Sequence, residues 1–228
     1  MGNVFIISGP SGSGQDTIIE ALRKEFLLER VVTTTTRPMR PGESDGHPYH
    51  FISKETFLSL RENGSFVECA ETYNGEWYGV QREDLETALA SKNIVIWKID
   101  YKGVATIKKQ FPHIISFLIE APAEILRKRL IKRDNPSEEY LQARMDYTNE
   151  WLTSKQLYDY CIKNEEGRLE EAVATIKTII QAEIIRLFHS SCAAFNIQAR
   201  SSNPLPPAVI TSGIISLPFN RIREDMLV

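Results

Sequence analysis

A glycine-rich segment near the start of the chain has the composition of a phosphate-binding loop. It reads GPSGSGQDT from Gly9 to Thr17, after the apolar run Val4 to Ser8 and before a segment of helical period. Glycine lets successive N–H groups converge, and a helix start adds partial positive charge, so the two together attract phosphate. The plain alternative is a glycine turn that only starts a helix. We favour a phosphate site with contacts from Gly9, Ser11, Gly12, Ser13, Gly14, Gln15, Asp16 and Thr17.

Two residues of this loop depart from the pattern G-x-x-x-x-G-K-[ST] that such loops follow. Gln15 stands in place of the lysine that reaches the β- and γ-phosphates, and Asp16 stands in place of the hydroxyl that binds magnesium. The loop has therefore lost its cation and gained a carboxylate.

A second group of polar residues follows the next predicted strand. Thr33 to Glu43 reads TTTTRPMRPGE, with Asp45-Gly46 and Tyr49-His50-Phe51 after it. This order resembles the guanylate kinase signature, in which T-T-R-x-x-R-x-G-E leads to D/N-G and then Y-x-F. Further matching segments extend the resemblance from Asn3 to Leu187. It implies a three-layer α/β P-loop kinase fold and ATP-dependent phosphorylation of GMP to GDP in purine nucleotide metabolism, with Mg²⁺ accompanying the ATP.

The resemblance also indicates which residues would hold the phosphate of GMP. They are Arg37 and Arg40, with Tyr49 and Tyr78 as hydroxyl donors. A nucleoside monophosphate carries a dianion, which guanidinium groups bind in fork geometry. The chemistry of these side chains therefore fits the role that the resemblance implies.

Two carboxylates resemble the residues that recognise the guanine base. A guanine edge offers N1–H and N2–H donors, which a carboxylate can accept. By resemblance Glu68 and Asp100 take that role, and Thr33 contacts O6. Val80 departs from the Ser or Thr that the family usually has there, which leaves one base contact open.

Three arginines resemble the family arginines that close over the triphosphate, namely Arg129, Arg133 and Arg144. Their charge would neutralise the charge that spreads across the transferred phosphoryl group. Asn164, near the end of the last predicted strand, resembles the residue that contacts the donor nucleotide.

The segment that leads to Asp100 carries another departure. The family usually has a second aspartate two residues earlier, close to magnesium, and here that position is Lys98. Because side chains alternate along a strand, Lys98 and Asp100 are expected on one face, beside the loop. Our hypothesis is a reciprocal substitution in which Lys98 supplies the missing cation and catalyses transfer, while Asp16 binds magnesium directly or through water. The alternative is a Lys98–Asp16 ion pair in an inactive site.

Loss of the loop lysine keeps a second function class open. Guanylate-kinase-like domains of scaffold proteins keep the fold, lose phosphoryl transfer and bind phosphorylated peptides or partners. A catalytically inactive nucleotide- or phosphopeptide-binding module is therefore the alternative, and Val80 suggests a kinase for another monophosphate as a third. The acceptor and lid arginines favour the guanylate kinase.

The elements that must position these residues alternate between short apolar runs and segments of helical period, which is typical of a parallel sheet with crossover helices. Parallel strands are predicted at Val4 to Ser8, Val31 to Thr34, Ile94 to Asp100, Ile114 to Ile119 and Tyr160 to Lys163. Helices are predicted over Thr17 to Leu27, from the N-cap Asn135 to Trp151, and over Leu169 to Leu187.

Residues 37–90 interrupt this alternation with a Pro- and Gly-rich segment and with short predicted strands at Tyr49 to Ile52, Ser65 to Ala70 and Trp77 to Val80. We therefore divide residues 1–188 into a core (1–36, 91–122 and 156–188), a GMP-binding insertion (37–90) and a helical lid (123–155). Residues 189–228 show no periodicity and are expected to form a poorly ordered tail.

The composition excludes several classes of protein. The 228 residues include 27 Lys and Arg against 30 Asp and Glu, so an overall basic field for nucleic acid or a membrane is absent. Three widely spaced cysteines argue against a disulfide framework or a zinc site and indicate a reducing compartment. We expect a cytoplasmic monomer or homodimer whose partners are the nucleotides ATP and GMP.

Overall fold

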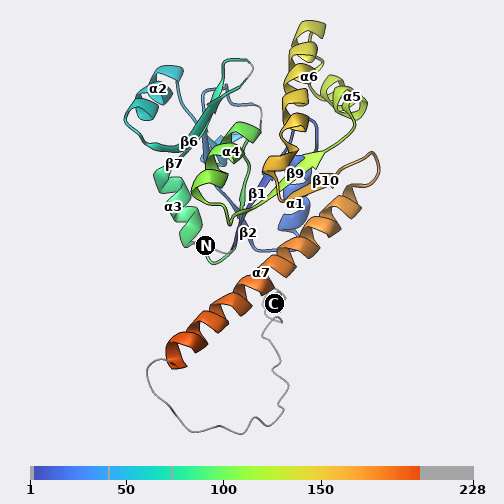
Figure 1. The fold of residues 1–228 in the computed structure, drawn as a ribbon. Helices are drawn as coiled ribbons and strands as arrows, with labels where there is room; N and C mark the ends of the chain where they lie inside the picture. The colour runs from blue at the N-terminus through green and yellow to red at the C-terminus, as the bar shows by residue number, and fades with distance from the viewer. Residues whose placement is uncertain (1–2, 41, 73, 201–228) are drawn as a thin grey trace, which may run out of the picture. The chain divides into compact units, whose positions relative to one another are not determined.

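A parallel sheet lies at the centre of the fold. The computed structural model describes residues 3–40, 42–72 and 74–200, and side chains as far as residue 186. Five strands form the central parallel sheet: β1 (Val4–Ser8), β2 (Leu28–Arg30), β8 (Ile94–Trp97), β9 (Ile115–Glu120) and β10 (Tyr160–Lys163). Their order is β10-β9-β1-β8-β2, and every neighbouring pair is parallel (Figure 1). The predicted α/β fold with a central parallel sheet is therefore confirmed.

Helices cover both faces of this sheet. They are α1 (Gln15–Arg23), α3 (Arg82–Ala90), α4 (Tyr101–Gln110), α5 (Ala123–Asp134), α6 (Glu138–Thr153) and α7 (Leu169–Arg200), with a short 3₁₀ helix at Lys155–Leu157. All five residues of β1 are buried, and their side chains alternate between the two faces. Phe5 and Ile7 belong to a core cluster with residues of α1 and α7, whereas Val4 and Ile6 belong to one with residues of α3, α4 and α6. The fold thus has the three predicted layers.

A second, mixed sheet contains β3 (Thr33–Thr35), β4 (Ser44–Asp45), β5 (Pro48–Phe51), β6 (Phe66–Glu71) and β7 (Trp77–Gln81). Its order is β4-β5-β3-β7-β6, and β7 is antiparallel to both β3 and β6. Helix α2 (Lys54–Glu62) packs on it through Phe57, whose ring stacks on Phe66 with centroids 4.3 Å apart. The three short strands expected between residues 49 and 80 are confirmed to within one or two residues at each end.

The strand predicted from Val31 to Thr34 is wrong as a single strand of the central sheet. Leu28–Arg30 pairs with β8 there, and the Val31 N–H still bonds to the Ile96 carbonyl at 3.1 Å. Thr33–Thr35 then pairs with β5 and β7 in the second sheet. Both segments favour extended backbone, and only pairing with distant strands decides which sheet each joins.

Several helices and strands also end at other residues than the sequence predicts. Helix α1 ends at Arg23 rather than Leu27, and β8 ends at Trp97 rather than Asp100. Helix α7 continues to Arg200 instead of stopping at Leu187. Residues 201–228 lie outside the described residues. The chain divides at this helix into two units, Met1–Phe188 and His189–Val228, and both sheets belong to the first.

The helix predicted to start with Asn135 as its N-cap begins later. Asn135 closes α5 in the left-handed conformation, with φ of 40°, and α6 is capped by Ser137. The Ser137 hydroxyl accepts a hydrogen bond from the Tyr140 N–H at 3.3 Å. Asn tolerates the left-handed region better than most residues, so one short segment ends one helix and starts the next.

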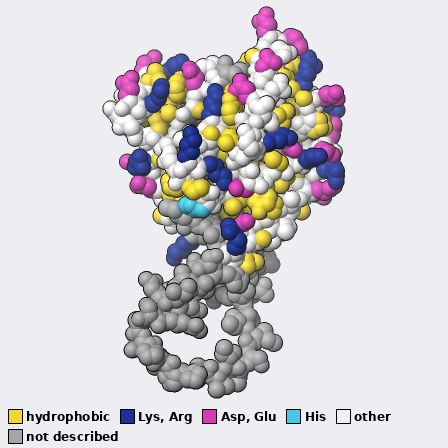
Figure 2. Space-filling model, in the orientation of Figure 1, with side chains coloured by type: hydrophobic (Ala, Val, Ile, Leu, Met, Phe, Trp, Pro, Cys, Tyr) yellow, Lys and Arg dark blue, Asp and Glu magenta, His cyan; other side chains and the backbone are white. Residues whose placement is uncertain are grey.

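The surface carries charges of both signs. On the face drawn in Figure 2, Lys and Arg side chains lie among Asp and Glu side chains. Within residues 3–200, apart from 41 and 73, no helix is both long and apolar enough to pass through a bilayer.

The capping contact of α6 gives a test of the fold. Ser137→Ala removes the acceptor for the Tyr140 N–H, and we expect it to lower the free energy of unfolding by about 1 kcal/mol. Ser137→Asp keeps an acceptor and should stay within about 0.5 kcal/mol of the parent. Urea unfolding followed by circular dichroism measures both. Equal stability of the alanine and aspartate variants would contradict the assigned cap.

Candidate active site

One cavity of about 680 Å³ gathers nearly all of the predicted site residues. Those lining it are Gly9, Ser11, Gly12, Gly14, Gln15, Asp16, Thr17, Thr33, Arg37, Arg40, Tyr49, Glu68, Tyr78, Lys98, Asp100, Arg129, Arg133, Arg144 and Asn164. Ser13 is the exception, because it is fully buried. The loops that follow β1, β8 and β10 all reach the cavity, since the carboxyl ends of parallel strands share one edge of a sheet.

The glycine-rich loop has the backbone that its sequence predicts. Gly12 and Gly14 take φ of 88° and 92°, in the left-handed region that favours glycine, and Gly14 precedes the first turn of α1. The Gln15 amide donates from Nε2 to the Gly9 carbonyl at 2.5 Å. Gln15 therefore closes the loop on itself, and no side-chain cation comes from this position.

Two predicted donor-site residues hold the loop from outside. Asn164 is 4% exposed and donates from Nδ2 to the Ser13 carbonyl at 2.7 Å. Arg129 donates to the Gly12 carbonyl at 3.1 Å and to the Asn164 carbonyl at 3.2 Å. These contacts join the loop to α5 and to the end of β10, and they fix the shape of the loop.

The other two predicted lid arginines share one carboxylate. Arg133 forms two bonds with Asp134, at 2.8 and 2.7 Å, and Arg144 reaches the same carboxylate at 3.3 Å. Arg144 also donates to the Ser11 hydroxyl at 2.7 Å and to Tyr140 at 3.0 Å. Helix α6 is thereby tied to the loop through Arg144.

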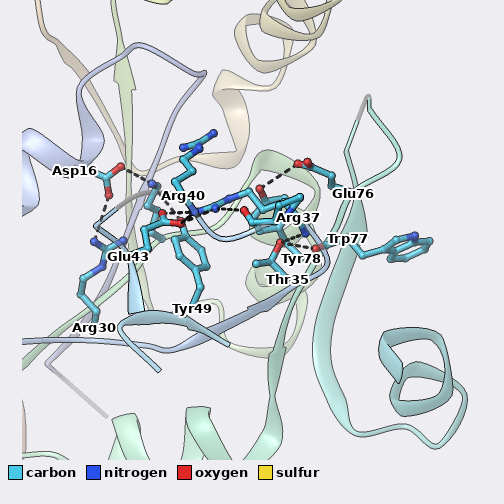
Figure 3. A network of polar contacts seen from close by, with 12 residues as sticks. Asp16, Arg30, Thr35, Arg37, Arg40, Glu43, Tyr49, Glu76, Trp77 and Tyr78 are labelled. Atoms are coloured by element: carbon cyan, nitrogen blue, oxygen red, sulfur yellow. Dashed lines mark hydrogen bonds and ion pairs between the residues drawn. The ribbon is translucent and has the colours of Figure 1, made fainter. Parts of the chain in front are cut away.

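Asp16 lies between two cations at the start of α1, and Figure 3 shows its contact with Arg30. Lys98 Nζ donates to its Oδ2 at 2.7 Å, and Arg30 Nη1 lies 3.2 Å from its Oδ1. Burial opposes ionisation of Asp16, but Lys98 and Arg30 outweigh it and lower its pKa. Lys98 Nζ also approaches the Tyr49 hydroxyl at 3.5 Å.

These contacts do not fit the predicted role of Asp16 as a direct magnesium ligand. Both of its carboxylate oxygens face a positive charge, which would compete with a metal ion. The residues that the structure describes contain no cluster of three or more His, Cys, Asp or Glu side chains placed to share a metal. A magnesium ion bound at Asp16, directly or through water, would have to compete with Lys98 and Arg30 for these oxygens.

Arg37, predicted to bind the GMP phosphate, is held by several contacts (Figure 3). Its guanidinium forms a bidentate pair with Glu43, at 2.7 and 2.6 Å, and lies 5.0 Å from the centroid of the Tyr49 ring. Burial opposes the charge of Arg37, but Glu43 outweighs it and raises the pKa. The Tyr78 ring meets Tyr49 edge-on at 6.2 Å, and burial raises the pKa of Tyr78 to about 12. The exposed Arg40 lines the same wall of the cavity.

The two predicted base-recognition carboxylates lie deep in the cavity. Burial and the nearby Asp100 carboxylate raise the pKa of Glu68 to about 8. Asp100 accepts from the Gly103 N–H at 2.8 Å and from the Tyr147 hydroxyl at 3.0 Å. Burial raises the pKa of Asp100, although these two bonds oppose the shift. The pair can accept two adjacent N–H donors once Glu68 is ionised.

Several residues of the site were not found from the sequence. Tyr147 reaches Asp100 from α6, three residues after Arg144 and so on the same helix face, a spacing that could have identified it. Arg30 gave no such signal, because its contact with Asp16 depends on β2 joining the central sheet.

Val80 is fully buried in the hydrophobic core and is not among the residues that line the cavity.

The loop geometry predicts different costs for two glycine substitutions. A Cβ at Gly14 would lie 2.3 Å from Asn164 Nδ2, whereas a Cβ at Gly64, also at positive φ, meets nothing within 4 Å. Both alanines strain the backbone, but Gly14→Ala also displaces the buried Asn164 amide. We expect it to destabilise the protein by about 1–3 kcal/mol more than Gly64→Ala, measured by urea unfolding. Equal losses for both variants would contradict the loop contact.

Comparisons with known proteins agree with this site. The family model described as guanylate kinase matches residues 1–183. A guanylate kinase from Symbiobacterium thermophilum is 39% identical over 84% of this chain and 90% of its own length. The rice guanylate kinase 2, chloroplastic/mitochondrial, is 36% identical over 79% of this chain, which spans only 64% of that protein. The crystal structure of guanylate kinase from Anaplasma phagocytophilum matches with a TM-score of 0.61 at 28% identity, covering 79% of this chain and 86% of its own. The family model over residues 1–183 and these relatives show that the chain belongs to the guanylate kinase family.

Proposed function

We propose that this protein transfers the γ-phosphoryl group of ATP to GMP, forming ADP and GDP. The observation that carries the proposal is the single cavity, in which the glycine-rich loop faces the acceptor arginines and the Glu68–Asp100 pair. A donor phosphate and an acceptor phosphate can therefore meet between them. Membership of the guanylate kinase family supports the same substrates.

The donor half of the cavity is built for a polyphosphate. The loop at the start of α1 offers backbone N–H groups, and Asn164 and Arg129 keep that loop in shape. Arg133 and Arg144 place two further positive charges beside it. We assign the loop residues and Asn164 to ATP, and Arg129, Arg133 and Arg144 to the transferred phosphoryl.

The acceptor half distinguishes guanine from the other bases. Arg37, Arg40, Tyr49 and Tyr78 are assigned to the GMP phosphate, because two guanidinium groups and two hydroxyls suit a dianion. Glu68 and Asp100 are assigned to guanine N1–H and N2–H, and Thr33 to O6. Adenine lacks these two donors, so its edge would leave buried carboxylate oxygens unpaired.

The reaction needs no covalent enzyme intermediate. A phosphate oxygen of GMP attacks the γ-phosphorus, the bond to the β,γ-bridging oxygen breaks, and its electron pair leaves with ADP. The chain aligns the two phosphates and stabilises the charge on the transferred group, so catalysis comes from position and electrostatics. The residues assigned here are accordingly cations, hydroxyls and backbone donors.

Several finer assignments complete the proposal. Mg²⁺ would arrive with ATP, because this ion binds through substrate phosphates and water with few protein ligands. The protein would work in purine nucleotide metabolism in the cytoplasm, as a monomer or a homodimer. Val80 is buried in the core, so we assign it no contact with the base.

The first test is turnover. With ATP and Mg²⁺, we expect GMP to be phosphorylated at least 100-fold more efficiently than AMP, CMP or UMP, on the order of what unpaired buried acceptors provide. A coupled assay of ADP formation measures kcat/KM for each nucleotide. GMP binding without turnover would instead support the inactive binding module, and preference for another monophosphate would contradict the assigned base contacts.

The second test is the pH dependence of GMP use. Guanine needs the Glu68 carboxylate, but before GMP binds Glu68 holds its proton below a pKa of about 8. Binding must then release that proton, so the KM for GMP should fall with rising pH, by about fivefold between pH 7 and 8, and level off above pH 9. Glu68→Gln should remove this dependence. A KM in the parent that does not change between pH 7 and 9 would contradict the assignment.

A further inference from the structure

The loop of this chain supplies no side-chain cation for the transferred phosphoryl group. Gln15 is neutral, and its amide donates to the Gly9 carbonyl within the loop. The next residue, Asp16, is negative, so the start of α1 has a neutral amide where phosphate loops carry a lysine and a carboxylate where they carry a hydroxyl. Another element must provide the positive charge if transfer is to be fast.

Lys98 leaves the central sheet at the edge where the loop begins. It follows Trp97, the fully buried last residue of β8, and β8 pairs in parallel with β1, which continues into the loop. The Lys98 side chain is 21% exposed and lines the cavity. A lysine directly after this neighbouring strand can therefore reach the space that a lysine in the loop would otherwise fill.

The ammonium of Lys98 contacts both halves of the cavity. It donates to Asp16 of α1 at 2.7 Å and approaches the hydroxyl of Tyr49, on β5 of the second sheet, at 3.5 Å. The Tyr49 ring in turn supports Arg37, which is assigned to the GMP phosphate. Lys98 thus lies between the donor loop and the acceptor phosphate site, where the transferred group must pass.

We propose that Lys98 is the relocated cation of this enzyme, a catalytic residue that binds the oxygens of the transferred phosphoryl, and that Asp16 is a positioning residue that holds Lys98 in place. This inference rests on the proposed phosphorylation of GMP. The ammonium has three donors, and its contacts with Asp16 and Tyr49 use two of them at most. It keeps its proton throughout, while the phosphoryl group changes its bond from the ADP oxygen to the GMP oxygen.

A purely structural ion pair explains this arrangement less well. The Asp16 side chain is 61% exposed, whereas the side chains of Lys98 and Arg30 are only 21% and 12% exposed, so one carboxylate faces two more deeply buried cations. Arg30 already pairs with Asp16 on its other oxygen, so Lys98 gives the three-residue cluster an excess of positive charge. That excess faces a cavity lined by the phosphate loop, where an anionic phosphate oxygen would balance it.

The experiment compares Lys98→Ala, Lys98→Arg and the double variant Lys98→Ala/Gln15→Lys with the parent. Lys177→Ala is the matched control, because Lys177 pairs with Glu25 and does not line the cavity. Turnover is measured with ATP, Mg²⁺ and GMP. Affinity for the ATP analogue with a nitrogen bridge between the β- and γ-phosphates, and for ADP, is measured by calorimetry. Thermal unfolding shows that each variant is folded.

We expect Lys98→Ala to lower kcat by about 10²–10³-fold, with the KM for GMP within about threefold of the parent. Lys98→Arg should keep more activity, and the loop lysine of the double variant should restore at least about tenfold. Lys98→Ala should also bind the ATP analogue about tenfold more weakly than the parent while its affinity for ADP stays the same. The Lys177→Ala control should match the parent.

A kcat within threefold of the parent for folded Lys98→Ala would overturn the proposal. If the parent itself shows no GMP-dependent turnover, the proposed function fails, and calorimetry alone then tests whether Lys98 contacts phosphate. A loss of affinity for the ATP analogue but not for ADP in Lys98→Ala would support that contact. Unchanged affinity for the analogue would overturn it.

The role of Asp16 is tested by measuring how the rate of an Asp16 variant depends on the Mg²⁺ concentration. As a positioning residue, Asp16→Asn should lower kcat about tenfold and leave the Mg²⁺ concentration for half-maximal rate unchanged. A tenfold rise in that concentration would show that Asp16 binds the metal and would overturn its assignment as a positioning residue.

Discussion

The site depends on holding several positive charges close together when no phosphate is bound. Like charges repel strongly in a partly buried cavity, so each cation needs a partner that keeps it in place. Here Arg37 has Glu43, Lys98 and Arg30 share Asp16, Arg133 and Arg144 share Asp134, and Arg129 binds backbone carbonyls. The cations are therefore oriented in advance, and substrate phosphates complete the balance of charge.

This constraint explains why the acidic side chains of the site are as important for its arrangement as the arginines and the lysine. Asp134 links α5 to α6 by pairing with an arginine of each, and the Arg144 contact with Ser11 extends that link to the loop. Tyr147, on the same helix, reaches Asp100 at the far end of the cavity. Helix α6 thus contacts both the glycine-rich loop and Asp100, so under the proposed assignments its position affects both substrates.

The departures in the loop follow the same logic. A lysine in the loop with an acid directly after β8, or an acid in the loop with a lysine directly after β8, places one positive and one negative charge across the same gap. Either arrangement lets the two side chains pair, because the carboxyl ends of β1 and β8 are neighbours. What differs is the element that carries the cation, and Arg30 adds a second positive charge beside it.

The sequence alone was sufficient for the alternation that specifies a parallel sheet, for the glycine-rich loop and for the family resemblance, because periodicity, glycine and motif order are local properties. It also predicts Lys98 and Asp16 as a complementary pair, and the structure places the two side chains in contact at 2.7 Å. Which sheet Thr33–Thr35 joins, where Asn135 ends a helix, and that Arg30 and Tyr147 reach the site were decided only by the tertiary structure. The physical reason is that strand pairing and side-chain contacts across the cavity depend on residues far apart in the chain, whose partners no local pattern specifies.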